Sequence, residues 1–497
     1  MNKNFLIKSV FWLTISEIIF NLSGYIIHSG VGRILGPAGY GQYGLVITLT
    51  TMIIILIGNG IPTAMSKYLS EFFEKEPEKI FQIKKETAYL QFIIIGLVTI
   101  VFYFSIPFIA NILNDSQLVP LFKISVLIIP AFASASFYFY YFTGLHKFNL
   151  QAILKTIRSL FKIIFILWLA WIWKVKGAII GYVFAPLSVF LIALIIDYFW
   201  LSPKILKNIK KDKLDKNLSQ KKVKNFYKQL FNYAWPFVLF TLFYEIMISI
   251  DLYMVKGLLH SNSLTGIYNG AITVGRIPYY LFYALTIVLL PTISRSTSLN
   301  LNKETKRTIY TTLRLLIIFL LPSIILMRSF ASPIIQIFYG NKFNASAPIM
   351  SILVWGVGFL TFFYVISAIF NGAGKVKIPM YLALGGAILN ASLSYYLIPF
   401  WKLKGAAWAT NFSSLISTIL ILFLLYYYFK INFPWLTLIR SFLGGLGIFL
   451  LVHFFPQQNL IFIFSSLILI FIYFMLLYIL GEIQQKDFFF WKNLFKN

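Results

Sequence analysis

The run KSVFWLTISEIIFNLSGYIIH, residues 8–28, decides the fold class. It is mostly apolar and contains no proline, and a helix needs about 20 mostly apolar residues to cross a bilayer. The run is too long for the apolar core of a signal peptide, and no clear cleavage site follows it. We therefore predict a retained first transmembrane helix.

Runs of the same kind recur along the whole chain. Only 12% of the residues are charged and 59% are hydrophobic, whereas soluble proteins carry about 25% charged residues. Too little polar surface remains to face water. We predict an all-α integral membrane protein of fourteen transmembrane helices, at residues 8–30, 44–66, 87–109, 118–141, 150–173, 177–199, 232–257, 264–291, 309–330, 346–370, 378–400, 405–429, 436–455 and 459–481.

The charge pattern orients these helices. The net charge is +28, and Lys and Arg are in roughly fourfold excess in alternate loops, as the positive-inside rule describes. This predicts a cell-membrane protein with both termini in the cytoplasm, and it explains the basic residues without a nucleic-acid partner. The chain has no cysteine and only four histidines, so we expect no disulfide, thiol chemistry, metal site or cofactor.

An internal repeat appears when the sequence is shifted by 228 residues. Residues 142–144 then meet 370–372, and the Lys-x-Lys-Gly-Ala of residues 174–178 meets that of 402–406. Each repeat holds an even number of spans, six, so the two six-helix repeats are predicted to be parallel. Transporters built from such repeats hold the substrate between them and alternate access by rocking. The predicted parts are 1–200 (first bundle), 201–231 (basic cytoplasmic linker), 232–430 (second bundle) and 431–497 (two extra helices and a tail).

Short motifs carry a resemblance to a known family. They are GRILGPAGYGQY at residues 32–43, GNGIP at 58–62, GIY at 266–268, LPTIS at 290–294 and NGAGK at 371–375. Over residues 5–430 the chain resembles the Wzx-type polysaccharide flippases of the multidrug/oligosaccharidyl-lipid/polysaccharide exporter superfamily, relatives of the MurJ lipid II flippases. The resemblance implies a MATE/MurJ-like fold. It also implies a non-enzymatic flippase that exports a polyprenyl-diphosphate-linked oligosaccharide from the inner to the outer leaflet.

Ionisable side chains inside the predicted spans mark candidate sites, because each is costly at that depth. Arg276 lies roughly 18 Å into its span at 1.5 Å per residue, next to Pro278, which predicts a kink. Its guanidinium suits paired hydrogen bonds to a diphosphate. The alternative is a structural ion pair with Asp251 or Glu245.

Two acids occupy equivalent positions in the repeats. Glu17 matches Glu245, and eleven residues later His28 matches Lys256. Eleven residues are about three turns, so each acid shares a helix face with the base that follows it. We predict that Glu17, Glu245 and Arg276 face one central cavity. The acids, with Asp251, are candidates for coupling to H⁺ or Na⁺, and the bases are candidates for substrate binding; helix-to-helix hydrogen bonding is the alternative.

A basic stripe is present in the first half alone. Lys155, Arg158 and Lys162 fall at i, i+3 and i+7, and their repeat equivalents are Ala383, Gly386 and Asn390. Arg158 and Lys162 are predicted to bind the anionic headgroup, whereas snorkelling to the interface suits Lys155. The lysine-rich loop 204–228 is predicted to lie near anionic membrane lipids, and Phe488–Lys492 to anchor at the interface.

Other functions remain open at this stage. An ion-coupled multidrug or metabolite antiporter of the related family shares the six-plus-six plan but usually has twelve spans. A membrane glycosyltransferase, polymerase or ligase typically needs an acidic motif or a large outer loop, and the outer loops here are short. A non-transporting scaffold does not explain buried charges at repeat-related positions. O-antigen and other lipopolysaccharide, capsule, teichoic-acid and peptidoglycan-precursor pathways fit equally well.

Overall fold

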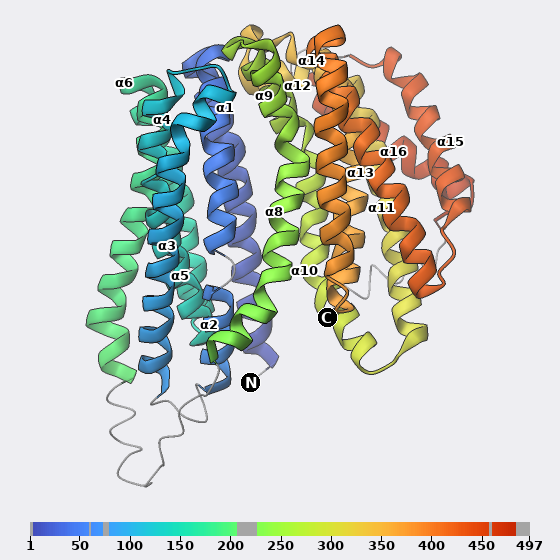
Figure 1. Cartoon of the computed structure of the whole chain (residues 1–497). Coiled ribbons are helices and arrows are strands. Elements are labelled where there is room, and N and C mark those ends of the chain that lie inside the picture. The colour runs from blue at the N-terminus through green and yellow to red at the C-terminus, as the bar shows by residue number, and fades with distance from the viewer. Residues whose placement is uncertain (1–2, 59–60, 73–78, 206–225, 457–459, 484–497) are drawn as a thin grey trace. The chain divides into compact units, whose positions relative to one another are not determined.

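The computed structural model describes residues 3–58, 61–72, 79–205, 226–456 and 460–483 (Figure 1). Within these ranges every regular element is a helix, which confirms the all-α class. The α-helices are α1 (Lys3–Gly58), α2 (Ile61–Phe72), α3 (Lys79–Ile112), α4 (Leu118–Ser125), α5 (Ile128–Gly144), α6 (Phe148–Ile196), α8 (Phe226–Leu259), α9 (Asn262–Gly275), α10 (Ile277–Ser298), α11 (Asn302–Ser329), α12 (Ala331–Tyr339), α13 (Ser346–Gly372), α14 (Lys377–Phe429), α15 (Trp435–Leu451) and α16 (Ile461–Ile479). A π-helix, η1 (Asp197–Leu201), extends α6, and two short 3-10 turns are η2 (Asn341–Phe343) and η3 (Val452–Phe454).

Contacts group the chain into two compact units, Met1–Gly266 and Ile267–Asn497. In the first unit α6 packs against α1 and α5, and α2 packs against α5. In the second unit α13 packs against α14 and α10, and α15 packs against α11 and α16. The predicted division into six-helix bundles stays a prediction. Most of the basic linker and the Phe488–Lys492 anchor lie outside the described residues.

Three of the long helices turn back on themselves. α1 contains Gly36 at φ 68°, α6 contains Lys174 at φ 53°, and α14 contains Lys402 at φ 49°. His28 and Tyr40, on either side of the α1 break, are joined by a 2.9 Å hydrogen bond, although an unbroken helix would separate them by about 18 Å. Each of these helices therefore supplies two antiparallel segments.

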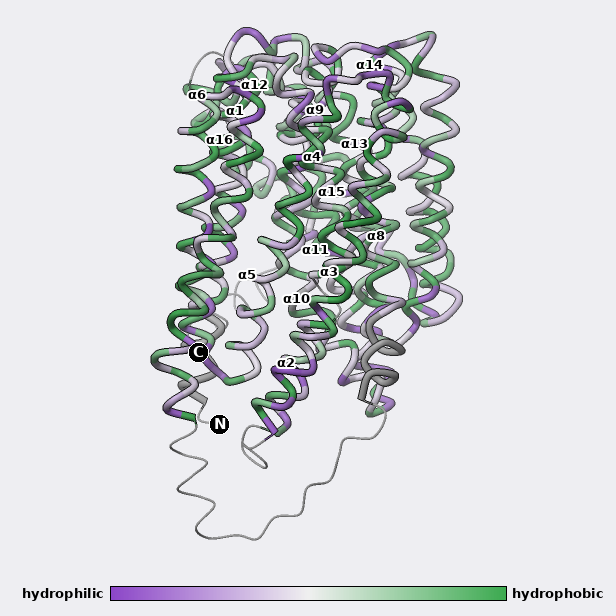
Figure 2. The backbone as a smooth tube through the Cα atoms, turned by 60° about the vertical axis from the view of Figure 1, so that its left-hand side comes forward, coloured by the Kyte–Doolittle hydropathy of each residue, from purple (hydrophilic) through white to green (hydrophobic). Residues whose placement is uncertain are grey.

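The membrane character is confirmed by length and hydropathy. Within the described ranges ten helices are long and apolar enough to cross a bilayer, or up to eleven if one bent pair is a single span. Hydrophobic residues predominate along these helices (Figure 2). Three of the long helices contain two antiparallel segments each, so ten or eleven helices are compatible with a larger number of membrane crossings. The count of fourteen stays a prediction.

Left-handed backbone conformations recur at the 228-residue offset found in the sequence. Lys174 and Lys402, 228 residues apart, both adopt the left-handed conformation and both break a long helix. His146 at φ 57° and Gly374 at φ 74° share the same offset, just after α5 and α13 end. These local features support the repeat, while the parallel relation of the two halves stays a prediction.

Close backbone approach holds the two arms of α6 together. A Cβ added at Gly177 would lie 1.8 Å from the Leu169 carbonyl oxygen, and one at Gly181 would lie 2.5 Å from that of Phe165. Small residues allow such approach between membrane helices, where van der Waals packing replaces the hydrophobic drive for association. The glycines therefore permit the hairpin that brings Lys162 to Tyr182.

We expect Gly177→Ala to destabilise the first unit, because the added methyl cannot be accommodated without separating the α6 arms. Overpacking costs about 1–3 kcal/mol or more, so the thermal transition followed by size-exclusion chromatography should fall by several degrees. Gly24→Ala is the matched control, since a Cβ at Gly24 meets no atom within 4 Å. Equal transition temperatures for the two variants would contradict the close approach.

The topology can be tested with single cysteines, because the sequence contains none. Ser116 in the α3–α4 loop and Asn149 at the start of α6 are both exposed. The predicted orientation places Ser116 outside and Asn149 in the cytoplasm. In intact cells an impermeant maleimide should label Ser116→Cys at once and Asn149→Cys only after permeabilisation. The reverse result would invert the orientation.

Candidate functional site

The basic cluster, defined as Lys155, Arg158 and Lys162, lies on one face of α6 within the first unit. The cationic groups lie 5.2, 5.5 and 5.4 Å from the ring centroid of Phe20 on α1. Arg158 is 4% exposed and Lys162 is 6% exposed. Burial of three cations around one aromatic ring is expensive, which marks this cluster as the leading candidate site in the unit.

Arg158 is held mainly by aromatic rings. Its guanidinium carbon lies 4.7 Å from the Phe139 centroid and 4.8 Å from that of Phe132, both on α5. Desolvated cation–π contacts of this kind contribute roughly 2 kcal/mol. The Nε and one Nη atom are buried without a hydrogen-bond acceptor. Arg158 can therefore donate to an anion that reaches it without breaking an existing bond from these atoms.

Lys155 and Glu17 form an ion pair between α6 and α1. The Lys155 side chain is 14% exposed, so its ammonium is bound to Glu17 and does not snorkel freely into solvent. The Glu17 side chain is 42% exposed. The helix-to-helix bond raised as an alternative for Glu17 is thus present. A role for Glu17 in ion coupling stays a prediction.

Lys162 is neutralised by no carboxylate among the described residues. Its ammonium donates to the Tyr182 hydroxyl at 3.1 Å and lies 4.2 Å from the centre of the same ring. Tyr182 comes from the returning arm of α6, so the hairpin creates this contact. The cluster therefore contains three cations and one directly paired carboxylate, which leaves an excess of positive charge for an anionic ligand.

Lys256 is engaged elsewhere in the unit. It is 2% exposed, and its ammonium donates to Asp115 at 2.7 Å and to Asn262 at 2.6 Å. Asn262 also donates to Asp115, at 2.9 Å. Burial by itself raises the pKa of Asp115, but the hydrogen bonds from Lys256 and Asn262 and the Lys256 charge outweigh it, so this pKa lies below its usual value. Lys256 was predicted to bind substrate; here it joins α8 to the α3–α4 loop.

The other predicted residues lie in different surroundings. His28 Nδ1 shares a 2.9 Å hydrogen bond with the Tyr40 hydroxyl. Asp251 is 1% exposed and accepts from the Leu252 backbone N–H at 2.8 Å, and Glu245 is half-buried. Arg276 is half-buried in the second unit, between the end of α9 and the start of α10 and beside Pro278. The kink at Pro278 stays a prediction. A common cavity for Glu17, Glu245 and Arg276 stays a prediction.

Sequence reasoning missed the buried acids Asp197 and Glu482. Asp197 is 3% exposed, forms an ion pair with Lys84, and accepts from Ser202 at 3.1 Å. The Lys84 ammonium also lies 4.6 Å from the Tyr141 ring centroid. The signal was available, because Asp197 is the one carboxylate in the predicted span 177–199. In the second unit Glu482 pairs with Arg314 and Arg440 and accepts from Thr437.

Comparison with known proteins assigns the chain to a family. The family model described as "Polysaccharide biosynthesis protein" matches residues 6–297, more than half of the sequence. The chain belongs to this polysaccharide biosynthesis protein family. A second model, MatE, matches residues 236–396, so the expected place in the superfamily that includes MurJ and MATE proteins is confirmed.

Two relatives match this chain over most of its length. An uncharacterised membrane protein of Methanocaldococcus jannaschii is 24% identical over 416 residues, covering 82% of this chain and 95% of the relative. The lipid II flippase MurJ of Bacillus subtilis is 23% identical over 445 residues, covering 82% of this chain and 79% of MurJ. Both matches extend over most of the membrane-spanning sequence.

Solved structures show the fold. An inward closed structure of the lipid II flippase MurJ matches with a TM-score of 0.70 at 19% identity, covering 95% of this chain and 98% of that one. An inward-facing multidrug resistance MATE family transporter matches with a TM-score of 0.64 at 12% identity, covering 85% and 98%. The polysaccharide biosynthesis family member described here therefore has the MurJ and MATE fold.

Asp115→Asn should destabilise the first unit, because it leaves the buried Lys256 ammonium without a counter-charge. Removing one partner of a buried ion pair costs about 3–5 kcal/mol. Thermal unfolding in detergent should show the loss, and Lys256→Met added to Asp115→Asn should recover much of it. A single variant as stable as the native protein would contradict the pairing.

The same pair predicts an acid limit to stability. Since the folded pKa of Asp115 is lowered, its contribution is fully present above the unfolded value of about 3.9. The contribution is lost as the pH falls through the lower, folded pKa. The stability difference between the native protein and Asp115→Asn should therefore shrink as the pH falls below about 4.

Proposed function

We propose that the protein is a flippase that moves a polyprenyl-diphosphate-linked oligosaccharide from the inner to the outer leaflet by alternating access, for cell-surface polysaccharide synthesis. The observation that carries the proposal is the buried Arg158 guanidinium, two of whose nitrogen atoms have no acceptor. A diphosphate cannot cross about 30 Å of hydrocarbon without counter-charges. An arginine with unused donors inside a membrane-spanning unit supplies them.

In this proposal each predicted residue has a role. Arg158 and Lys162 bind the diphosphate, and Arg276 adds paired hydrogen bonds during passage. His28 and Lys256 contribute to substrate binding, Lys256 after release from Asp115. Glu17, Glu245 and Asp251 carry the coupling ion, H⁺ or Na⁺. Glu17 can do so when movement of α6 separates it from Lys155.

The proposed molecule has fourteen transmembrane helices in two parallel six-helix repeats plus two C-terminal helices, with both termini in the cytoplasm. Its partners are the lipid-linked oligosaccharide, membrane lipids and the coupling ion. The match of the family model to residues 6–297 supports a polysaccharide pathway. Among such pathways, O-antigen, teichoic-acid and related lipid-linked precursors share the diphosphate that the proposal uses.

A second candidate is an ion-coupled multidrug antiporter, and the MatE match at residues 236–396 favours it. Many multidrug substrates are cations, which the excess positive charge of the basic cluster would repel. The two candidates therefore differ in the charge of the substrate. A transport assay that compares an anionic lipid with cationic drugs separates them.

We expect Arg158→Ala and Arg276→Ala each to reduce export of the lipid-linked glycan by at least about tenfold, because a charge-assisted hydrogen bond is lost. Arg276→Lys should restore it poorly, since an ammonium lacks the guanidinium fork. The measurement is accumulation of lipid-linked glycan in the inner leaflet of a flippase-deficient strain carrying each variant.

The control for this experiment is Lys147→Ala, in the loop between α5 and α6, which should export nearly normally. Immunoblots of membranes establish equal amounts of each variant. If Arg158→Ala and Arg276→Ala are present at normal levels and export fully, cation binding of the diphosphate is wrong. Efflux of cationic drugs with no glycan export would favour the antiporter instead.

A further inference from the structure

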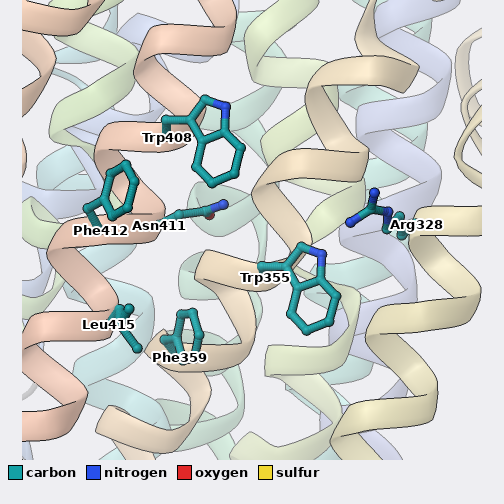
Figure 3. Close-up of a pocket in the computed structure, with 7 residues that line it drawn as sticks. All are labelled: Arg328, Trp355, Phe359, Trp408, Asn411, Phe412 and Leu415. Atoms are coloured by element: carbon teal, nitrogen blue, oxygen red, sulfur yellow. The ribbon is translucent and has the colours of Figure 1, made fainter. Parts of the chain in front are cut away.

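A crevice in the second unit is lined by none of the residues used above. Its volume is about 310 Å³, and it is lined by α11, α13 and α14 through Arg328, Trp355, Phe359, Trp408, Asn411, Phe412 and Leu415 (Figure 3). Pockets that bind small molecules have volumes of about 300–1,000 Å³. Four of the seven lining residues are aromatic, and a single basic residue stands among them.

Arg328 is an unusual residue in this position. It follows the apolar run 315–327 of α11, and the apolar α12 begins three residues later. Arg328 lies in the last turn of α11, near the end of the predicted span 309–330, where an unpaired charge beside hydrocarbon favours an anionic partner. Its side chain is exposed, and its contact within the described ranges is the Phe449 ring at 6.0 Å. No carboxylate among those residues pairs with it.

Other polar atoms of the crevice also lack partners. Asn411 is 5% exposed; its amide nitrogen donates to the Ile352 carbonyl at 2.9 Å, but its Oδ1 is buried with no hydrogen bond. Gly356 allows this oxygen to approach α13, since a Cβ there would lie 2.4 Å from it. In the part of the chain that the structure describes, the indole N–H groups of Trp355 and Trp408 have no acceptor. The Asn411 Oδ1 atom faces α13, so a ligand in the crevice can use the Arg328 cation and the indole N–H donors.

An apolar track leads away from the crevice along α14. Phe412, Ile416, Ile419 and Phe423 are all exposed, and their spacing of four, three and four residues puts them on one helical face. An extended hydrocarbon chain that starts in the crevice would continue along this face. A small hydrophilic anion would leave both the track and the aromatic walls without a partner.

We propose that this crevice binds one anionic phospholipid. The phosphate pairs with Arg328 and accepts from the Trp355 indole N–H, and an acyl chain lies against Phe359, Phe412 and Leu415. A zwitterionic lipid offers the same phosphate but adds a cationic headgroup that the guanidinium repels. The proposal concerns a resident membrane lipid and is independent of the transported substrate.

The test is native mass spectrometry of the delipidated full chain titrated with dioleoyl phosphatidylglycerol. The native protein should retain one tightly bound lipid. Arg328→Gln should weaken this binding by about tenfold, because a charge-assisted contact is lost. Leu415→Trp should weaken it similarly by filling the crevice. Arg307→Gln is the matched control, an exposed arginine near the other end of α11, and should bind as the native protein does.

Competing ligands separate the alternatives. Dioleoyl phosphatidylcholine should bind at least about tenfold more weakly than phosphatidylglycerol, and glycerol 3-phosphate should not displace the lipid. Unchanged phosphatidylglycerol binding in folded Arg328→Gln and Leu415→Trp would overturn the proposal. So would displacement by glycerol 3-phosphate, which identifies a free-phosphate site, or tighter binding of an isoprenyl phosphate, which identifies an isoprenoid site. Size-exclusion chromatography and melting temperature confirm that each variant is folded.

Discussion

The structure depends on one constraint: a charge placed in hydrocarbon must be compensated inside the protein. Ion pairs between distant parts of the chain show how the described residues compensate buried and partly buried charges. Glu17 pairs with Lys155, Asp197 with Lys84, Asp115 with Lys256, and Glu482 with Arg314 and Arg440. Each pair joins elements that are separated in sequence, so charge compensation also fixes which helices and loops lie together.

Turned-back helices make these pairings possible. The breaks at Gly36, Lys174 and Lys402 reverse the chain without a long loop, and glycines let the returning arm of α6 lie in backbone contact with the first. In lipid every backbone group must be satisfied within the segment, so a short break between two helices exposes few unpaired groups. The free-energy cost of the left-handed conformation at Lys174 and Lys402 is small compared with the cost of leaving backbone groups unpaired in lipid.

Much of the fold follows from sequence, but the partners in the site do not. Length and hydropathy predicted an all-helical membrane protein, and the 228-residue offset located two helix breaks of the same kind. Spacing on α6 put Lys155, Arg158 and Lys162 on one face. Spacing along one helix cannot identify a partner on another, so the pairing of Lys155 with Glu17 and the rings around Arg158 required coordinates. Asp197 was detectable, since it is a lone acid in an apolar run.

The amino-acid composition explains why some basic side chains have no carboxylate partner. The chain has 43 basic and 15 acidic residues, so carboxylates cannot neutralise every cation, and those left over within apolar sequence need other partners. Arg158 and Lys162 use aromatic rings and a tyrosine hydroxyl and are nearly inaccessible, which suits a ligand admitted only when helices move. Arg328 is exposed beside an open crevice, which suits a ligand that is always present in the membrane. The difference in accessibility, more than the shared charge, separates a transport site from a site for a resident lipid.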